Sequence, residues 1–138
     1  GDCFHCHSST APEVFISPDR TFANNGLDSV SSVLDFTDFG LGKFTRNTDD
    51  YGRFKIPTLR NLAFSAPYMH DGRFATLDEV IDFYNDGPKG SPTLEPIMRE
   101  KANKRVELTG HWGLSLSVQD KADLKAFLLS LSDSSFVQ

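Results

Sequence analysis

Two cysteines and a histidine near the start of the chain, in the stretch CFHCH, have the types and the spacing that could do chemistry. Residues i, i+3 and i+4 lie on one face of a helical turn, so the side chains of Cys3, Cys6 and His7 would project together. Cys-x-x-Cys-His is the attachment signature of c-type haem, in which both thiols form thioethers with the porphyrin and the histidine binds the iron. The spacing therefore predicts heme c, bound covalently, with His7 as an iron ligand.

Two other interpretations of these residues stay open. Cys3 and Cys6 could form a structural disulfide. They could also belong to a zinc site that is completed by two of the four histidines, His5, His7, His70 and His111. Neither alternative explains why a histidine directly follows the second cysteine.

A loop-rich region must surround this site. The first ten residues predict a short helix with Asp2 as its N-cap. From residue 10 to about residue 58 the sequence is rich in Ser, Asn, Asp and Gly, and only residues 27–36 predict a short helix. Pro57 and Pro67 bracket one further helical turn. Because loops of this length are uncommon in a domain unless they serve a function, we expect them to form the walls of the haem site.

Two later segments carry clear helix signals. Thr76 and Glu79 form a capping box and Gly87 ends the helix that follows, while Ser117 and Asp120 form a similar box before the last helix. The apolar residues of each helix recur at i, i+3, i+4 and i+7 and share one face: Leu77, Val80, Ile81 and Tyr84 in the first, and Leu124, Phe127, Leu128 and Leu131 in the second. We expect the last helix to close the core.

The remainder of the chain predicts no further regular element. Residues 88–116 are loop-like, with a basic cluster at 99–105 that we expect on the solvated surface and with Trp112 packed in a loop or in the core. No segment alternates as a strand would. The predicted fold is therefore all-α with long loops, as a single domain over residues 1–138.

Length and composition limit the function. The chain has 138 residues, a net charge of −5 and no apolar run near the ~20 residues that a membrane span requires. Its fourteen Lys and Arg residues are scattered, which argues against a nucleic-acid surface. Gly1 lies only two residues before Cys3, so we expect the chain to be a mature or shortened piece of a longer protein.

Further motifs occur in a recognisable order: FANNGLD at 22–28, DFGLGKFT at 38–45, FKIPTLRN at 54–61, APYMHDGRF at 66–74 and DLKAFLLSLSD at 123–133. Together with CFHCH, they resemble the C-terminal haem domain of the bacterial diheme cytochrome c peroxidase family, which includes the MauG-like enzymes. The resemblance covers most of the chain. It implies a cytochrome c-like fold that holds the electron-transfer haem of a diheme oxidoreductase.

In the family, the haem that reacts with hydrogen peroxide lies in an N-terminal domain, which is absent from this chain. The resemblance therefore implies that this domain by itself only transfers electrons and has no catalytic residue of its own. It would pass electrons to a peroxidatic haem, or share oxidising equivalents with it, and that haem would be encoded upstream or on a separate chain. A small redox protein would be the electron donor or the protein substrate. Covalent haem attachment in bacteria of this family implies the periplasm.

The second iron ligand is the open question at this site. Family peroxidases place a Met fourteen residues after the His of the Pro-Tyr-x-His motif, whereas here the residue fourteen after His70 is Tyr84, as in the MauG-like members. Met69 is the rival ligand and Met98 is a third candidate. A Met ligand would raise the reduction potential of an electron relay, whereas an anionic Tyr oxygen would favour stored oxidising equivalents. Tyr84 could also be a core residue with its hydroxyl bonded to backbone.

Other positions carry family roles by resemblance. His70 is an interface or electron-path residue near the haem, although it could itself bind iron. Arg60 could pair with a haem propionate or hold a loop carbonyl. The backbone carbonyls of Ser65 and Pro67 correspond to ligands of a calcium ion that lies between the two domains of family members. That calcium site would be incomplete without the other domain.

Two alternatives to the diheme function remain at this point. The chain could be a free-standing monohaem cytochrome c that only carries electrons. It could also be a haem-free zinc or disulfide module. An upstream Cys-x-x-Cys-His in the gene would exclude the first, and a missing haem absorption band after expression with a haem-attachment system would support the second.

Overall fold

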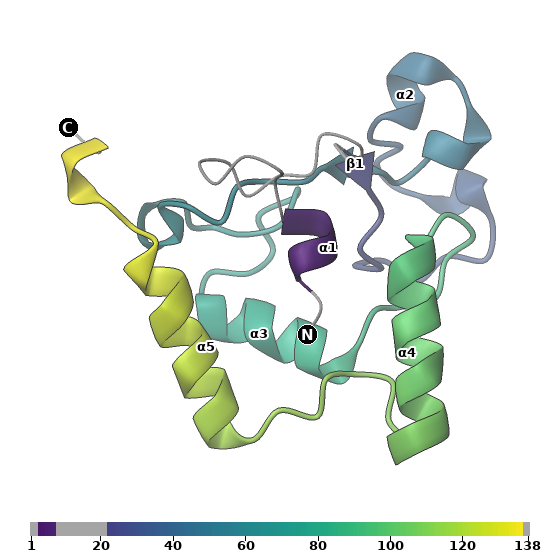
Figure 1. Cartoon of the computed structure of the whole chain (residues 1–138). Coiled ribbons are helices and arrows are strands. Elements are labelled where there is room, and N and C mark those ends of the chain that lie inside the picture. The colour runs from purple at the N-terminus through teal and green to yellow at the C-terminus, as the bar shows by residue number, and fades with distance from the viewer. Residues whose placement is uncertain (1–2, 8–21, 137–138) are drawn as a thin grey trace.

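The computed structural model of the chain describes residues 3–7 and 22–136. The long helices α3 (Leu77–Asp86), α4 (Pro96–Thr109) and α5 (Val118–Ser130) all come from the C-terminal half. Figure 1 shows α4 and α5 at opposite sides of the molecule, with α3 between them and the short N-terminal helix α1 (Phe4–His7) above α3. The predicted Asp2 N-cap of this first helix lies outside the described residues.

Helix α3 forms where its sequence signals predict it. The Thr76 hydroxyl accepts a hydrogen bond from the backbone N–H of Glu79 (3.3 Å), and the Glu79 carboxylate accepts one from the N–H of Thr76 (2.8 Å). Gly87, at φ 102°, ends the helix. Of the predicted apolar face, Leu77 and Ile81 are buried and Val80 and Tyr84 are half-buried, so the face is confirmed in part; Phe83 is buried as well. This helix carries Tyr84 on the same side.

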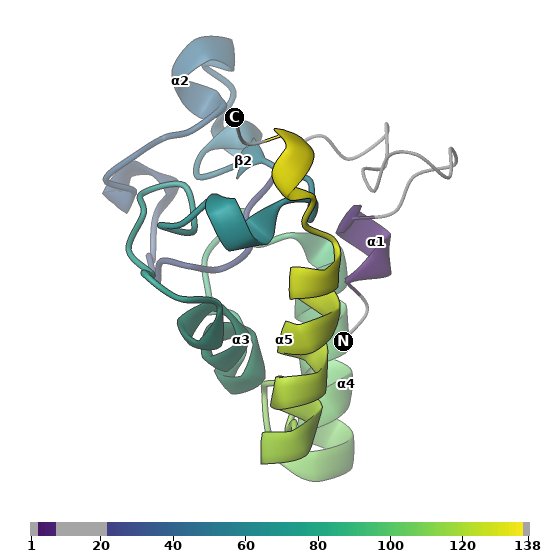
Figure 2. The same ribbon diagram turned by 90° about the vertical axis from the view of Figure 1, so that its left-hand side faces the viewer.

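Helix α5 also begins at its predicted capping box, with the Ser117 hydroxyl accepting from the N–H of Asp120. It lies against α3 (Figure 2), and two ion pairs join the helices: Lys121 Nζ to Asp82 (2.7 Å) and Lys125 Nζ to Asp78 (2.6 Å). No residue of this helix is buried, and the Phe127 side chain is 54% exposed. The expectation that α5 closes the core is therefore wrong for the described structure, because its apolar stripe is only half covered.

Helix α4 corrects the prediction that residues 88–116 are loop. It spans Pro96–Thr109, with Pro96 in the first turn and Gly110 at the C-cap in the left-handed region (φ 71°). Its sequence, PIMREKANKRVELT, is polar on almost every face, so the apolar period that identifies a surface helix is missing. Its one buried residue is Ala102, which is fully covered. The basic cluster lies on this helix, and Trp112 packs in the loop after it by donating from Nε1 to the Pro88 carbonyl.

A small sheet corrects the prediction that the chain has no strands. Strands β1 (Phe22–Ala23) and β2 (Phe54–Lys55) pair antiparallel, with Phe22 opposite Lys55. Two residues are too few to show the period of two that identifies a strand in a sequence. The fold is thus helix-rich with few strands rather than strictly all-α.

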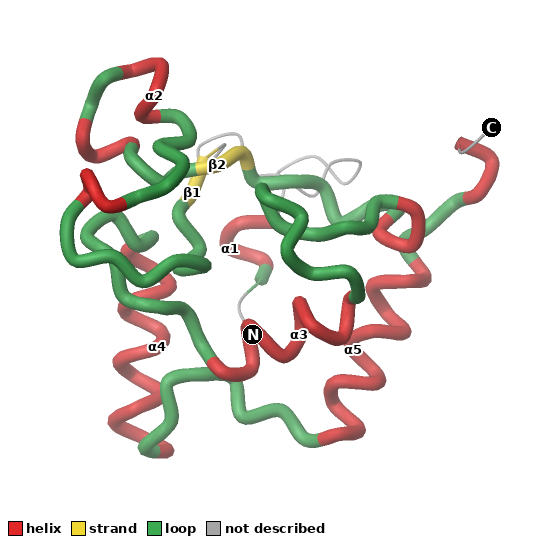
Figure 3. Tube along the Cα trace, turned by 180° about the vertical axis from the view of Figure 1, so that it is seen from behind, coloured by secondary structure: helices red, strands yellow, loops and turns green. Residues whose placement is uncertain are grey.

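Loops and single helical turns make up much of the remaining described chain, as Figure 3 shows. The predicted helix at 27–36 is a single 3-10 turn, and the turn expected between Pro57 and Pro67 is confirmed as another. The short elements are η1 (Val33–Asp35), α2 (Gly42–Thr45), η2 (Thr48–Asp50), η3 (Leu62–Phe64) and η4 (Ser134–Phe136).

The buried side chain of Asn24 holds these loops to the segment before α4. It is 3% exposed and donates to the hydroxyls of Ser91 and Thr93, both at 3.0 Å. Thr93 in turn donates to the Tyr51 carbonyl (2.6 Å). Because buried polar groups are costly unless they are paired, this network fixes three loop segments relative to one another. Within the described ranges, no helix is long and apolar enough to cross a membrane.

Candidate haem site

Helix α1 brings the two cysteines and the histidine of the N-terminal motif together. The backbone N–H of His7 donates to the Cys3 carbonyl (2.9 Å), and the N–H of Cys6 donates to the same oxygen (3.2 Å). This single turn is the arrangement that the spacing predicts. The two cysteines form no disulfide; Cys3 is exposed, and Cys6 and His7 are half-buried.

The ring of His7 is oriented by a backbone carbonyl. His7 Nδ1 lies 3.0 Å from the Pro57 oxygen, and because a carbonyl only accepts, Nδ1 must carry the proton. Burial lowers the pKa of His7, and the hydrogen bond to Pro57 opposes that effect only in part. The imidazole is therefore held neutral with the lone pair of Nε2 available, which is the state that binds a metal ion. Pro57 lies in the motif FKIPTLRN. The sequence could not reveal this contact, because it is made by a backbone carbonyl, which every residue has.

Tyr84 lies on α3 with its hydroxyl inside the molecule. Burial raises the pKa of this phenol, a hydrogen bond from Asn25 lowers it, and the nearby Cys3 and Cys6 raise it. The Asn25 amide nitrogen lies 3.4 Å from the phenolic oxygen.

Met69 lies beside the same amide. Asn25 Nδ2 is 3.6 Å from the Met69 sulfur, and Met69 has a left-handed backbone (φ 72°) in the turn before α3. Both candidate second ligands, Tyr84 and Met69, are thus gathered around one side chain. The sequence prediction named the two ligands but missed Asn25, although the stretch FANNGLD already stood among the resembling motifs.

The other predicted site residues lie on exposed turns. The ring of His70 is exposed and stacks on Phe54, with centroids 3.6 Å apart and planes 9° from parallel. Arg60 is exposed, and its backbone N–H donates to the Thr58 hydroxyl (3.2 Å). Ser65 and Pro67 are exposed in the loop after η3, where the peptide bond before Pro67 is cis.

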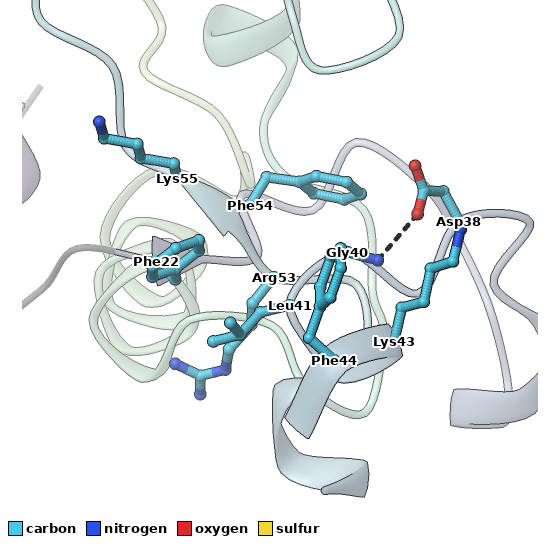
Figure 4. Close-up of a pocket in the computed structure, with 9 residues that line it drawn as sticks. All are labelled: Phe22, Asp38, Gly40, Leu41, Lys43, Phe44, Arg53, Phe54 and Lys55. Carbon is cyan, nitrogen blue, oxygen red and sulfur yellow. Dashed lines mark hydrogen bonds between the residues drawn. The ribbon is translucent and has the colours of Figure 1, made fainter. Parts of the chain in front are cut away.

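Figure 4 shows a surface pocket of about 420 Å³ that is lined in part by Phe54, the residue on which His70 stacks. The rings of Phe22, Phe44 and Phe54 line it, and Phe44 is 80% exposed. Three cationic side chains and one carboxylate also line the pocket: Lys43, Arg53, Lys55 and Asp38. The pocket is linked to the predicted site residues only through the stacking of His70 on Phe54, and none of the residues that line it is Asn25, Met69 or Tyr84.

The described residues fit a haem better than a zinc ion. Among them, no group of three or more Cys, His, Asp or Glu side chains could hold a metal ion. His111 Nδ1 accepts from the Gly113 N–H (3.1 Å) in the loop after α4, and His70 stacks on Phe54. By contrast, the neutral His7, the adjacent cysteines and the half-buried Tyr84 supply two thiols and two potential iron ligands, which is a donor set that suits a c-type haem.

Comparisons with known proteins show which class of protein the chain resembles. No family profile matches the chain. The chain is 32% identical to Cytochrome-c peroxidase IdrP2 of Denitromonas iodatirespirans over 96% of its length, and 31% identical to Methylamine utilization protein MauG of Methylorubrum extorquens over 94%. A crystal structure of a MauG-like protein associated with microbial copper homeostasis superposes on 99% of the chain with a TM-score of 0.75 and 34% identity.

These relatives define a class of oxidoreductases, the cytochrome-c peroxidases and MauG proteins. Within that class, the chain matches the MauG-like diheme cytochrome c peroxidase family. This match implies a covalently bound c-type haem. The chain covers 36% of IdrP2, 30% of MauG and 44% of the MauG-like structure, so it spans less than half the length of these relatives.

Proposed function

We propose that this chain is a cytochrome c-like domain that carries the electron-transfer haem of a MauG-like diheme oxidoreductase. In this proposal Cys3 and Cys6 would attach the haem, and His7 and Tyr84 would hold its iron. Two observations carry the proposal: one helical turn brings Cys3, Cys6 and His7 together, and the half-buried Tyr84 on α3 has its hydroxyl 3.4 Å from the Asn25 amide nitrogen. The haem, when bound, supplies an iron that gains and loses single electrons.

The protein's own groups prepare both axial positions. The Pro57 carbonyl fixes the tautomer and the orientation of His7, which keeps Nε2 available. On the other side, an oxygen ligand from Tyr84 would favour oxidised iron more than a thioether would. This ligand pair suits a haem that holds an oxidising equivalent for use at a distance.

The remainder of the reaction belongs to parts of the protein beyond this chain. We infer that the rest of a longer protein carries the peroxidatic haem, where hydrogen peroxide reacts, and that His70 lies on the electron path or the domain interface. A small redox protein would supply the electrons or be the protein that is oxidised. The periplasm is the proposed location, because covalent haem attachment in bacteria of this family takes place there.

Two further groups would serve this assembly. The exposed Arg60 could pair with a haem propionate through its planar guanidinium. The carbonyls of Ser65 and Pro67 could bind calcium, but a calcium ion takes about six to eight oxygen ligands, so the other domain would have to supply most of them. Both roles are therefore proposed only for the complete protein.

A second function is favoured by the position of Met69. Its sulfur lies at the same amide as the Tyr84 hydroxyl. If Met69 binds the iron, the domain becomes a conventional electron relay of higher potential, whether in a diheme protein or as a monohaem cytochrome. The two candidate ligands therefore predict different functions.

The test is the ferric optical and EPR spectrum of the chain expressed with a haem-attachment system. We expect Tyr84→Phe to change the iron spectrum, and Met69→Leu and the control Tyr51→Phe to leave it unchanged. Tyr51 is a half-buried tyrosine that stacks on Phe39, so it controls for the loss of a phenolic hydroxyl. A sulfur-to-iron charge-transfer band in the wild type that disappears in Met69→Leu would contradict the proposal.

A further inference from the structure

We propose that Asn25 is a positioning residue that selects the second iron ligand, because its side-chain amide holds the Tyr84 hydroxyl in place and restrains the Met69 sulfur. This inference rests on the proposed function, in which Tyr84 binds the iron. It adds a residue that neither the motif nor the ligand set identifies. Three features of the structure support it: the contacts of the amide, the rigidity of the segment that carries it, and the restraint on Met69.

The amide of Asn25 meets both candidate ligands at once. Its Nδ2 lies 3.4 Å from the Tyr84 oxygen and 3.6 Å from the Met69 sulfur. A side-chain amide nitrogen carries two protons, so one N–H can be directed to each acceptor. The three side chains are half-buried and come from separate segments: the loop after β1, the turn before α3, and α3 itself. Only the folded chain brings them together.

The segment that carries Asn25 is held firmly. The preceding Asn24 is buried, donates to two hydroxyls, and accepts from the Gly26 N–H through its side-chain oxygen (2.9 Å). The Gly26 carbonyl accepts from the Lys89 N–H (2.7 Å), and the Asn24 carbonyl accepts from the Glu95 N–H (3.0 Å). Asn25 is therefore fixed on both sides, as a group that orients a metal ligand must be.

The same segment also restrains Met69. Arg73, in the turn that contains Met69, donates to the Asp28 carboxylate (2.8 Å) and to the Leu27 carbonyl (3.4 Å). The Tyr68 N–H donates to the Phe74 carbonyl (2.7 Å), which closes the turn. These hydrogen bonds hold the backbone of the turn that carries Met69, and so they also help to keep its sulfur near the Asn25 amide. Both acceptors keep a second lone pair, so the selection lies in orientation: the closed turn and the amide direct the Met69 sulfur to Asn25, while the amide positions the Tyr84 oxygen at the end of α3.

The experiment replaces the amide while keeping its approximate shape. Asn25→Asp and Asn25→Leu both remove the N–H donors, and the exposed Asn103 on α4 provides the control Asn103→Leu. All variants are expressed with haem attachment and examined by ferric optical and EPR spectroscopy. We expect the Asn25 variants to show a mixture of two ligand states, with about a fivefold shift from oxygen toward sulfur ligation, as the loss of one ordinary hydrogen bond allows. Adding Met69→Leu to Asn25→Leu should remove the sulfur-ligated fraction.

Two results would overturn the selection role. The first is a wild-type spectrum in both Asn25 variants while Tyr84→Phe changes the iron. The second is loss of haem from both Asn25 variants but not from Asn103→Leu, which would mean that Asn25 supports the fold and does not select a ligand. If Tyr84→Phe leaves the spectrum unchanged, the proposed ligand itself is wrong, and the selection falls with it. The Tyr84 variant thereby separates the two failures.

Discussion

Asn24 and Asn25 are neighbours in the sequence but have different tasks. The buried Asn24 ties loop segments together, and Asn25 presents its amide to Tyr84 and Met69. Sequence reasoning could place FANNGLD in a loop, but it could not assign either amide, because the partners lie more than forty residues away along the chain. Contacts of this kind depend on the tertiary structure, and they produce no periodic pattern in the neighbouring sequence.

The turn at Gly26 gives a stability prediction at this scale. Gly26 has φ +75°, and a Cβ there would lie 2.7 Å from Pro88 Cβ and 2.8 Å from the Lys89 oxygen. We expect Gly26→Ala to lower the free energy of unfolding by about 1–3 kcal/mol, because a side chain is strained in this backbone region and has no space. Denaturant unfolding measures the change. Gly90→Ala, where nothing lies within 4 Å of the added carbon, should have little effect; equal losses would contradict the argument.

Among the elements, helices were predictable where their ends carry chemical signals. The capping boxes at Thr76 and Ser117 predicted the starts of α3 and α5, and both are confirmed. Helix α4 lacks a side-chain cap and an apolar stripe, so the only local signals were Pro96 near its start and Gly110 at its end. Strands of two residues have too little sequence to show a pattern. Local signals therefore identify α3, which carries Tyr84, but not the loops that face it.

The capping box of α3 gives the next prediction. We expect Thr76→Ala to cost about 1 kcal/mol of unfolding free energy, since the N–H of Glu79 loses its acceptor. Ser117→Ala removes the matching cap of α5 and should cost a similar amount. Because α3 carries Tyr84 and α5 does not, only Thr76→Ala should also broaden the ferric EPR signal of the haem-loaded chain. Equal spectra in the two variants would show that the start of α3 does not affect the ligand.

The turn before α3 gives a pH prediction. A hydrogen bond from Arg73 holds the pKa of Asp71 below its ordinary value, with burial opposing the effect. The stability from this pair is therefore present above the unfolded-state pKa of 3.8 and is lost as the pH falls through the lower folded-state value. We expect Asp71→Asn to be less stable than the wild type near neutral pH, with the difference shrinking in acid. Thermal unfolding across this pH range tests it, with the exposed Glu107→Gln as the control; a difference that grows in acid would refute the pairing.

The whole molecule has a thin apolar core in its described part. The buried apolar residues there are Leu27, Phe36, Ile56, Leu77, Ile81, Phe83, Leu94 and Ala102, and no large side chain is less than 2% exposed. Leu77, Ile81 and Phe83 lie on α3, Ala102 lies on α4, and the others lie in loops or short turns. Several large apolar side chains elsewhere are exposed, including Phe44 and Phe127. Apolar burial between side chains therefore contributes less here than is usual for a domain of this length.

Haem attachment should accordingly supply a large share of the stability. We expect the double variant Cys3→Ala/Cys6→Ala to unfold at a temperature at least ~10 °C lower than the haem-loaded chain. A ligand present at a hundred times its dissociation constant adds about 2.7 kcal/mol to the free energy of unfolding, and we expect a covalently bound haem to add at least as much. For a domain of this size, each kcal/mol raises the temperature midpoint of unfolding by roughly 4 °C. Limited proteolysis should then cut first within residues 24–76, where loops predominate, and later in α3 and α5. If the two proteins had equal midpoints and equal cleavage patterns, the loops would be ordered by protein contacts alone, and the proposed role of these loops as walls of the haem site would be wrong.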